Sequence, residues 1–181
     1  MNRIQTIKFL IAIVSFMLAF NILIYFSQKL EPQQFYSPDG GFSVMIEGTP
    51  KEEIQLVNTL IGALPLRAYS SEVGGIAYLV SYTDFPPQYN FNSTNAQKIL
   101  DSSRDGMASN VFGKVTSERL ISINGYPGRY LTIAADNGGA VKAYVYLVKN
   151  RMYMLVVATS SSRIYDNSVH NFLDSFKLEG N

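Results

Sequence analysis

The segment Lys114–Thr159, KVTSERLISINGYPGRYLTIAADNGGAVKAYVYLVKNRMYMLVVAT, decides the fold. Four stretches rich in β-branched and aromatic residues alternate in it with short polar turns, which is the pattern of antiparallel strands. We expect strands at 114–123, 129–135, 140–148 and 152–159. The turns between them contain Asn-Gly, Asp-Asn-Gly-Gly and Asn-Arg, and Asn and Gly accept the positive φ that tight hairpins require. The segment therefore predicts a four-stranded antiparallel meander.

Upstream of this meander the chain carries a further group of strands. Ser37-Pro38-Asp39-Gly40-Gly41 reads as a turn, and Phe42–Ile46 follows it with strand periodicity. We expect a second strand at Ile54–Leu60. The segments Leu66–Val73 and Ile76–Phe85 flank Gly74-Gly75 and read as a hairpin.

Two segments have helical spacing instead. Apolar residues recur every three to four positions within Thr94–Asn110, and Asn110 or Gly113 can close this helix. The second helix is expected at Ile164–Ser175. Strands, one helix, a meander and one helix, in that order, predict the α+β class. The simplest architecture is a twisted antiparallel sheet flanked by helices.

The apolar run Phe9–Phe26, FLIAIVSFMLAFNILIYF, precedes this domain and contains no charged residue. As a helix it would rise about 27 Å, close to the thickness of a hydrocarbon core. The run exceeds the apolar core of a secretory signal, and no small-x-small cleavage site fits. We expect an uncleaved signal anchor at 1–30, spanning the membrane at about 9–26, and one domain at 31–181. A cleaved signal peptide and a buried soluble helix are the alternatives.

The basic residues around the run set its expected orientation. Arg3 and Lys8 precede it and Lys29 follows, which places the N-terminus in the cytoplasm. The domain would then be periplasmic, extracellular or thylakoid-lumenal, joined to the membrane by a short linker, Leu30–Tyr36.

Charge and cysteine content exclude several function classes. The domain holds all 14 Asp and Glu residues, whereas three of the 15 Lys and Arg residues precede it. It therefore lacks the basic excess that nucleic-acid binding requires. The chain has no cysteine, which excludes disulfides, thiolate nucleophiles and zinc–thiolate sites.

Six short motifs occur in order along residues 35–178: Ser37–Phe42 (SPDGGF), Gly48–Pro50 (GTP), Leu100–Gly106 (LDSSRDG), Asn124–Arg129 (NGYPGR), Leu147–Tyr153 (LVKNRMY) and Phe172–Phe176 (FLDSF). Each motif alone consists of turn-forming residues and apolar core residues. The ordered set, however, resembles the PsbP-like family. The resemblance implies an α/β/α sandwich around an antiparallel sheet. It also implies an accessory, non-catalytic function with no transferable active site.

Photosynthetic members of this family support calcium and chloride retention at photosystem II. The resemblance therefore implies calcium as the one conceivable cofactor, and a photosystem II-associated extrinsic subunit as an alternative function. This chain departs from those members, because it has no Trp after the first strand and no lipid-anchoring cysteine.

His170 is the only histidine, and Asp166 and Asp174 lie four residues to either side of it. On one helix these three side chains can share a face, so they are candidate metal ligands. The alternative is an ordinary solvated helix face. Ser160, Ser161 or Ser162 with His170 would suit a hydrolase, but no Gly-x-Ser-x-Gly motif occurs, and we expect no enzyme.

The candidate partner-binding residues are aromatic and surround Pro86-Pro87: Tyr82, Phe85, Tyr89 and Phe91. Such rings near a Pro-rich loop are typical of recognition patches, although core packing is the alternative. On the first helix, Arg104 is placed to pair with Asp101. The function that we expect is a membrane-anchored, non-enzymatic domain that binds a protein partner.

Overall fold

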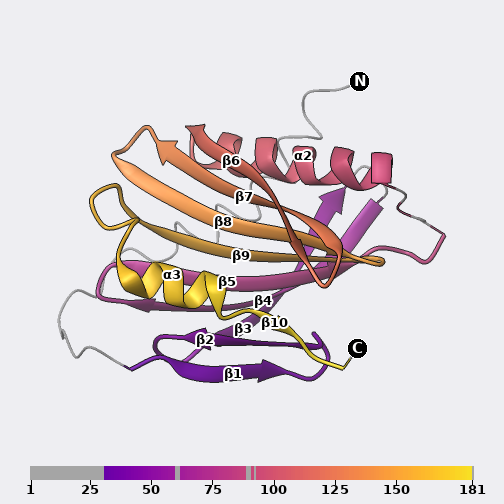
Figure 1. The fold of residues 1–181 in the computed structure, drawn as a ribbon, viewed down its shortest axis with the longest axis horizontal. Coiled ribbons are helices and arrows are strands. Elements are labelled where there is room, and N and C mark those ends of the chain that lie inside the picture. The colour runs from indigo at the N-terminus through magenta and orange to yellow at the C-terminus, as the bar shows by residue number, and fades with distance from the viewer. Residues whose placement is uncertain (1–30, 60–61, 89–90, 92, 181) are drawn as a thin grey trace.

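The computed structural model describes residues 31–59, 62–88, 91 and 93–180, which fold around one large antiparallel sheet (Figure 1). The elements are β1 (Gln33–Ser37), β2 (Phe42–Ile46), β3 (Lys51–Thr59), β4 (Gly62–Val73), β5 (Ile76–Asp84), α2 (Ser93–Asn110), β6 (Gly113–Ile123), β7 (Tyr126–Ala135), β8 (Gly139–Val148), β9 (Arg151–Ser160), α3 (Asn167–Asp174) and β10 (Lys177–Leu178).

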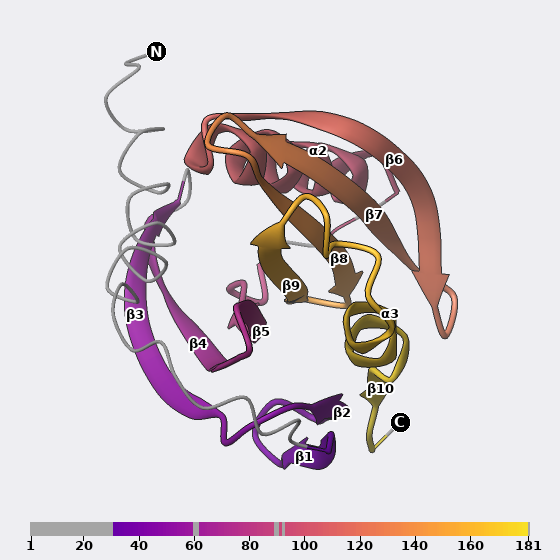
Figure 2. The same cartoon turned by 90° about the vertical axis from the view of Figure 1, so that its left-hand side faces the viewer.

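The large sheet has seven strands in the order β3-β4-β5-β9-β8-β7-β6, and every neighbouring pair is antiparallel. It consists of two meanders, β3–β5 and β6–β9, which meet where β5 pairs with β9. The sheet is strongly curved, with β3 at one edge and β6 at the other (Figure 2). Each meander contains a tight turn of residues with positive φ: Asn124 and Gly125 (49° and 82°) between β6 and β7, and Gly74 and Gly75 (57° and 79°) between β4 and β5.

The two faces of the sheet are covered differently. Helix α2 packs on one face, where Leu100 and Met107 join Leu131 and Ile133 in a buried cluster. The other face is covered by α3 together with a small three-stranded sheet in the order β1-β2-β10. The expected α+β fold with helices on both faces of a twisted antiparallel sheet is confirmed, and the small sheet is an addition to it.

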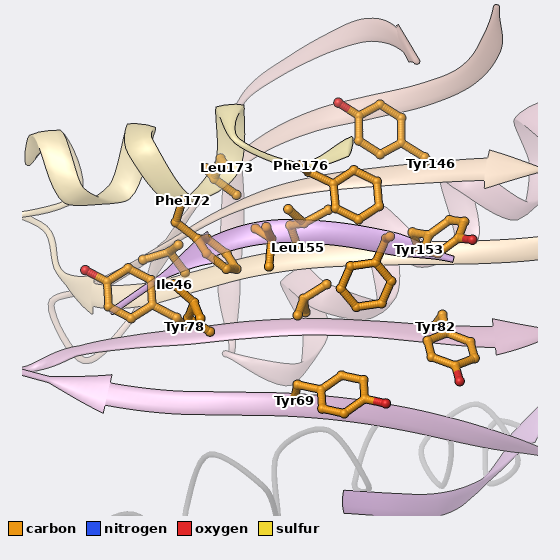
Figure 3. Packing of buried hydrophobic residues seen from close by; sticks show 14 of the residues in the cluster. Ile46, Tyr69, Tyr78, Tyr82, Tyr146, Tyr153, Leu155, Phe172, Leu173 and Phe176 are labelled. Atoms are coloured by element: carbon orange, nitrogen blue, oxygen red, sulfur yellow. The ribbon is translucent and has the colours of Figure 1, made fainter. Parts of the chain in front are cut away.

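The core beneath α3 and the small sheet is unusually aromatic (Figure 3). Alternation along β5 sends Tyr78 and Tyr82 to this side and Leu79 to the α2 side. Phe42 of β2 is completely buried, and its ring centroid lies 5.5–6.3 Å from five other rings, which belong to Phe35, Tyr69, Tyr82, Tyr153 and Phe176. These contacts fasten the small sheet to the large one.

Tyr78 makes this core sensitive to alkali. Burial raises the pKa of Tyr78 to about 12 from the ordinary 10.0, so between these pH values the folded protein keeps a proton that the unfolded chain loses. Stability is therefore fully present below pH 10 and falls as the pH rises through about 12. We expect Tyr78→Phe to reduce this loss by about 2 kcal/mol. Urea unfolding at pH 9 and 12 checks this, and Tyr36→Phe, at an exposed ring, should leave the loss unchanged.

Most predicted elements are present with ends shifted by a few residues. Two short strands were missed: β1 occupies most of the expected linker 30–36, and β10 follows the last helix. The last helix begins at Asn167 and not at Ile164, because turn hydrogen bonds from Arg163 N to Ser160 O and from Asp166 N to Arg163 O hold the preceding residues.

The chain leaves α2 through a residue that is not a glycine. Phe112, and not Gly113, adopts positive φ (48°) where the chain leaves the helix. Gly113 is needed because a Cβ atom there would overlap the carbonyl oxygen of Ala134. Asn110 is the last helical residue, as predicted.

Within the described residues, no helix is long and apolar enough to cross a membrane. The anchor predicted at 1–30 lies outside the described residues.

Candidate functional site

The three predicted metal ligands lie on or beside α3, but each contacts a different partner. Asp166 accepts a hydrogen bond from Nε of Arg163 at 2.9 Å. Asp174 accepts one from Oη of Tyr144 at 2.6 Å. In the part of the chain that the structure describes, no group of three His, Cys, Asp or Glu residues is arranged to hold a metal ion. Calcium takes six to eight oxygen ligands, so the residues around His170 do not fit a calcium site.

Beside His170 lies a buried lysine that sequence reasoning missed. Lys142 on β8 is 1% exposed, and its Nζ is 3.4 Å from Nε2 of His170 and 4.4 Å from the ring centroid of Tyr165. Among the described residues no carboxylate lies within ion-pair distance of Lys142. The contact holds the end of the Lys142 side chain against α3.

The serines considered for a hydrolase site bond elsewhere. Oγ of Ser161 donates to the carbonyl oxygen of Gly138 at 2.9 Å, and Oγ of Ser160 and Ser162 are 3.1 Å apart. The hydrogen bond of Ser161 ties the β9–α3 loop to the β7–β8 turn. No hydrogen bond between these serines and His170 is found in the described part of the chain.

The structure separates the four predicted partner-binding aromatics. Tyr82 is 6% exposed and packs in the α3-side core, with the Arg151 guanidinium 4.5 Å from its ring centroid. Phe85 and Phe91 contact each other on the α2 side, at a centroid distance of 5.0 Å. Tyr89 lies outside the described residues. Their role in binding a partner stays a prediction, but Tyr82 does not belong to one surface with Phe85 and Phe91.

A network of charged residues joins α2 to β6 and β7. Arg104 lies 3.5 Å from Asp101, as predicted, and also contacts Glu118 at 3.2 Å. Beneath them, the buried Arg129 donates to Asp101 at 2.8 Å and lies 2.9 Å from Glu118. Nη1 of Arg129 is buried without a hydrogen-bond partner in the described part of the chain. This network holds the helix against the sheet edge.

An open groove of about 290 Å³ lies where β1 meets β3 and β4. Its lining residues are Phe35, Tyr36, Ser37, Pro38, Asp39, Glu52, Arg67 and Tyr69. Glu52 accepts hydrogen bonds from Arg67 at 2.5 Å and from Oη of Tyr69 at 3.3 Å. The bond to Glu52 raises the pKa of Arg67, so the guanidinium stays charged. The groove therefore presents a fixed ion pair beside aromatic rings.

Exposed apolar residues continue this groove along β3. Ile54 and Leu56 are 57% and 72% exposed, and Tyr36 on the opposite rim is 56% exposed. Side chains alternate along β3, so Glu52, Ile54 and Leu56 lie on one face of the sheet. Arg67 lies on the same face, because it is the partner of Ile54 on β4. We call the groove residues together with Ile54 and Leu56 the β1–β3 surface. It combines rings, aliphatic groups and an ion pair on one side of the molecule.

The arrangement of the elements has a counterpart among solved structures. The solution structure of cyanobacterial PsbP (CyanoP) from Synechocystis sp. PCC 6803 aligns with a TM-score of 0.56, covering 87% of this chain and 98% of that chain. The fold is PsbP-like. Sequence identity over the alignment is 9%, so the similarity concerns the fold alone. No protein-family model matches the chain, and no curated protein sequence matches it.

Within this PsbP-like fold, the β1–β3 surface was missed by sequence reasoning. A strand was expected over Ile54–Leu60, but the sequence does not show that the small sheet stops short of it and leaves one face open. The visible signal was the spacing of Ile54 and Leu56, which places two large apolar groups on the same face of an expected strand.

Proposed function

We propose that this chain is a membrane-tethered accessory protein whose PsbP-like domain faces the non-cytoplasmic side and binds a protein partner without catalysis. The observation that supports this most directly is the β1–β3 surface. Protein interfaces are enriched in Tyr and Arg and depleted of Lys and Glu, and a few such residues supply most of the binding energy. Tyr36 and Arg67 in this surface are of the enriched kinds.

The place of this surface in the chain supports a partner at the membrane. β1 begins at Gln33, shortly after the apolar run ends at Phe26. A tether at Phe9–Phe26 would hold the β1–β3 surface close to the bilayer. The partner that this arrangement suits is another membrane protein or a protein bound at the same face.

The chemistry of the remaining candidates supports a non-catalytic role. His170 contacts Lys142, Asp166 pairs with Arg163, and the serines of the β9–α3 loop bond to main-chain carbonyls or to each other. These groups maintain the fold. A photosystem II-associated role, implied by the family resemblance, stays a second candidate on that ground alone.

The test is crosslinked co-purification of the full-length protein from its own membranes, with partners identified by mass spectrometry. We expect Tyr36→Ala combined with Arg67→Ala to lower partner recovery at least about tenfold, which corresponds to roughly 1.4 kcal/mol. Leu120→Ala, at a 73% exposed residue on the far edge strand β6, is the matched control and should change nothing.

Three outcomes contradict or redirect this proposal. Equal recovery with the wild type and the double variant would show that the β1–β3 surface is not the binding site. Recovery of the chain without any other protein would contradict partner binding. Photosystem II subunits among the recovered proteins would establish the second candidate.

A further inference from the structure

The two edges of the large sheet are protected to different degrees. Edge strands with free main-chain groups tend to pair with other chains, and proteins discourage this with bulges and charges. β6 has both, because its register shifts between Val115 and Ser117 and it carries Lys114, Glu118 and Arg119. Arg119 also covers the ring of Tyr130 at 4.2 Å. The β6 edge is therefore protected against pairing with a strand of another chain.

The β3 edge lacks these protections. Its pairing with β4 runs without interruption from Lys51–Ser70 to Thr59–Gly62, and no strand pairs with its other side among the described residues. All three of its charges, Lys51, Glu52 and Glu53, lie at one end, and the six residues from Ile54 to Thr59 are uncharged. An edge strand of nine residues without a bulge, three of whose six uncharged residues are apolar, is suited to accept another strand.

We infer that the occupant of this edge is a second copy of the chain, whose β3 pairs antiparallel with the first around a two-fold axis at Gln55. In this register each charged residue faces an uncharged one: Lys51 faces Thr59, Glu52 faces Asn58, and Glu53 faces Val57. Like charges directly opposite each other are destabilising, and this register has none.

The same register brings the exposed apolar groups together. Ile54 of each copy faces Leu56 of the other, so four side chains that are more than half exposed in one copy form a single cluster. Aliphatic cross-strand pairs of this kind stabilise a sheet through the area that they bury. The pairing would join two seven-stranded sheets into one of fourteen strands.

Symmetry makes this dimer compatible with attachment to one membrane. The two-fold axis between antiparallel strands is perpendicular to the sheet, so the corresponding faces of both copies lie on the same side. β1, which follows the apolar run, belongs to the layer on the α3 face, and both copies therefore start on that side. Confinement to a membrane raises the effective concentration and favours a small interface. Only this last point rests on the tether of the proposed function.

The absence of cysteine gives this inference a direct test. Facing residues of an antiparallel pair have Cα atoms about 4.5–5.5 Å apart, within disulfide range. Gln55→Cys in the full-length protein, oxidised mildly in its membranes, should yield a disulfide-linked dimer. Glu53→Cys is the matched control on the same face: its two copies would be about 14 Å apart along the strands at ~3.4 Å per residue, beyond disulfide reach. We expect at least tenfold more dimer with Gln55→Cys than with Glu53→Cys or Leu120→Cys.

A second variant tests the apolar cluster. Leu56→Lys in the Gln55→Cys background should lower the dimer yield at least tenfold, and Leu120→Lys in that background should leave it unchanged, with thermal unfolding confirming that both variants fold. Equal yields from Gln55→Cys and Glu53→Cys would overturn the register. If no dimer forms, the edge is free or otherwise covered. If a disulfide adduct forms with a different protein, a foreign strand lies at the edge. Either result overturns the inference.

The failure of this inference is distinguishable from failure of the proposed function. Partner recovery depends on Tyr36 and Arg67, whereas the dimer depends on the main chain of β3 and on Ile54 and Leu56. A chain that recovers its partner but gives no Gln55→Cys dimer retains the proposed function and loses only the self-pairing.

Discussion

Replacing Phe42 by alanine is expected to lower the free energy of unfolding by about 4 kcal/mol. The side chain is completely buried, and its ring lies against five others contributed by β1, β4, β5, β9 and the segment after α3. Its removal leaves a cavity where the small sheet meets the large one, and the surrounding rings cannot all move in to fill it. Since domains of this size are stable by about 5–15 kcal/mol, a large share of the total stability is lost.

Urea unfolding of the domain, followed by circular dichroism, measures this effect. Phe112→Ala is the matched control, because it makes the same chemical change at a ring that is 78% exposed. The control should change stability by less than about 1 kcal/mol. Similar losses from both variants would show that Phe42 has no special place in the core.

Replacing Arg129 by leucine is expected to lower stability by about 3 kcal/mol. The guanidinium is buried between Asp101 of α2 and Glu118 of β6, and leucine would leave two carboxylates without their nearest cation. Breaking a fully buried pair costs 3–5 kcal/mol. The lower end applies here, because both carboxylates are partly exposed and keep contacts with Arg104.

A double-mutant cycle with Asp101→Asn separates the ion pair from the packing of the arginine side chain. We expect a coupling energy of at least about 1 kcal/mol, because the two groups are in direct contact. A coupling near zero would mean that Arg129 contributes only the packing of its aliphatic part.

The β6–β9 meander was predictable because its turns and strands are specified by residues that are adjacent in the sequence. Asn124 and Gly125 adopt the positive φ values that their tight turn requires, and the strands on either side contain β-branched and aromatic residues. The same local logic placed β2 and α2 within a residue of their observed ends. The short strand β1 was missed because QQFYS is polar and forms a strand only through pairing with β2 and docking of Phe35 on Tyr69, at a centroid distance of 4.7 Å.

The sites were less predictable, since they depend on which faces are covered. Lys142 lies between Val141 and Ala143 in β8, so its side chain points to the face of the strand opposite to theirs. On that face the sequence predicts an exposed lysine. It is buried because the segment around Tyr165 and His170 covers it, a contact between distant parts of the chain. Tyr82 and Phe85 are close in sequence, but residues three positions apart in an extended chain point to opposite faces.

Residues 175–179 hold β2 in place. Lys177 and Leu178 pair with Ser43 and Phe42, Oγ of Ser175 accepts from N of Met45, and Oγ of Ser43 donates to Glu179 at 2.6 Å. Synthesis on the ribosome proceeds from the N-terminus, so β1 and β2 emerge long before β10, which pairs with the second side of β2. The hairpins of the meander can form during translation, whereas the small sheet and the aromatic core beneath it close only once residues 175–179 have been added. Termination of translation before residue 175 would leave that core open.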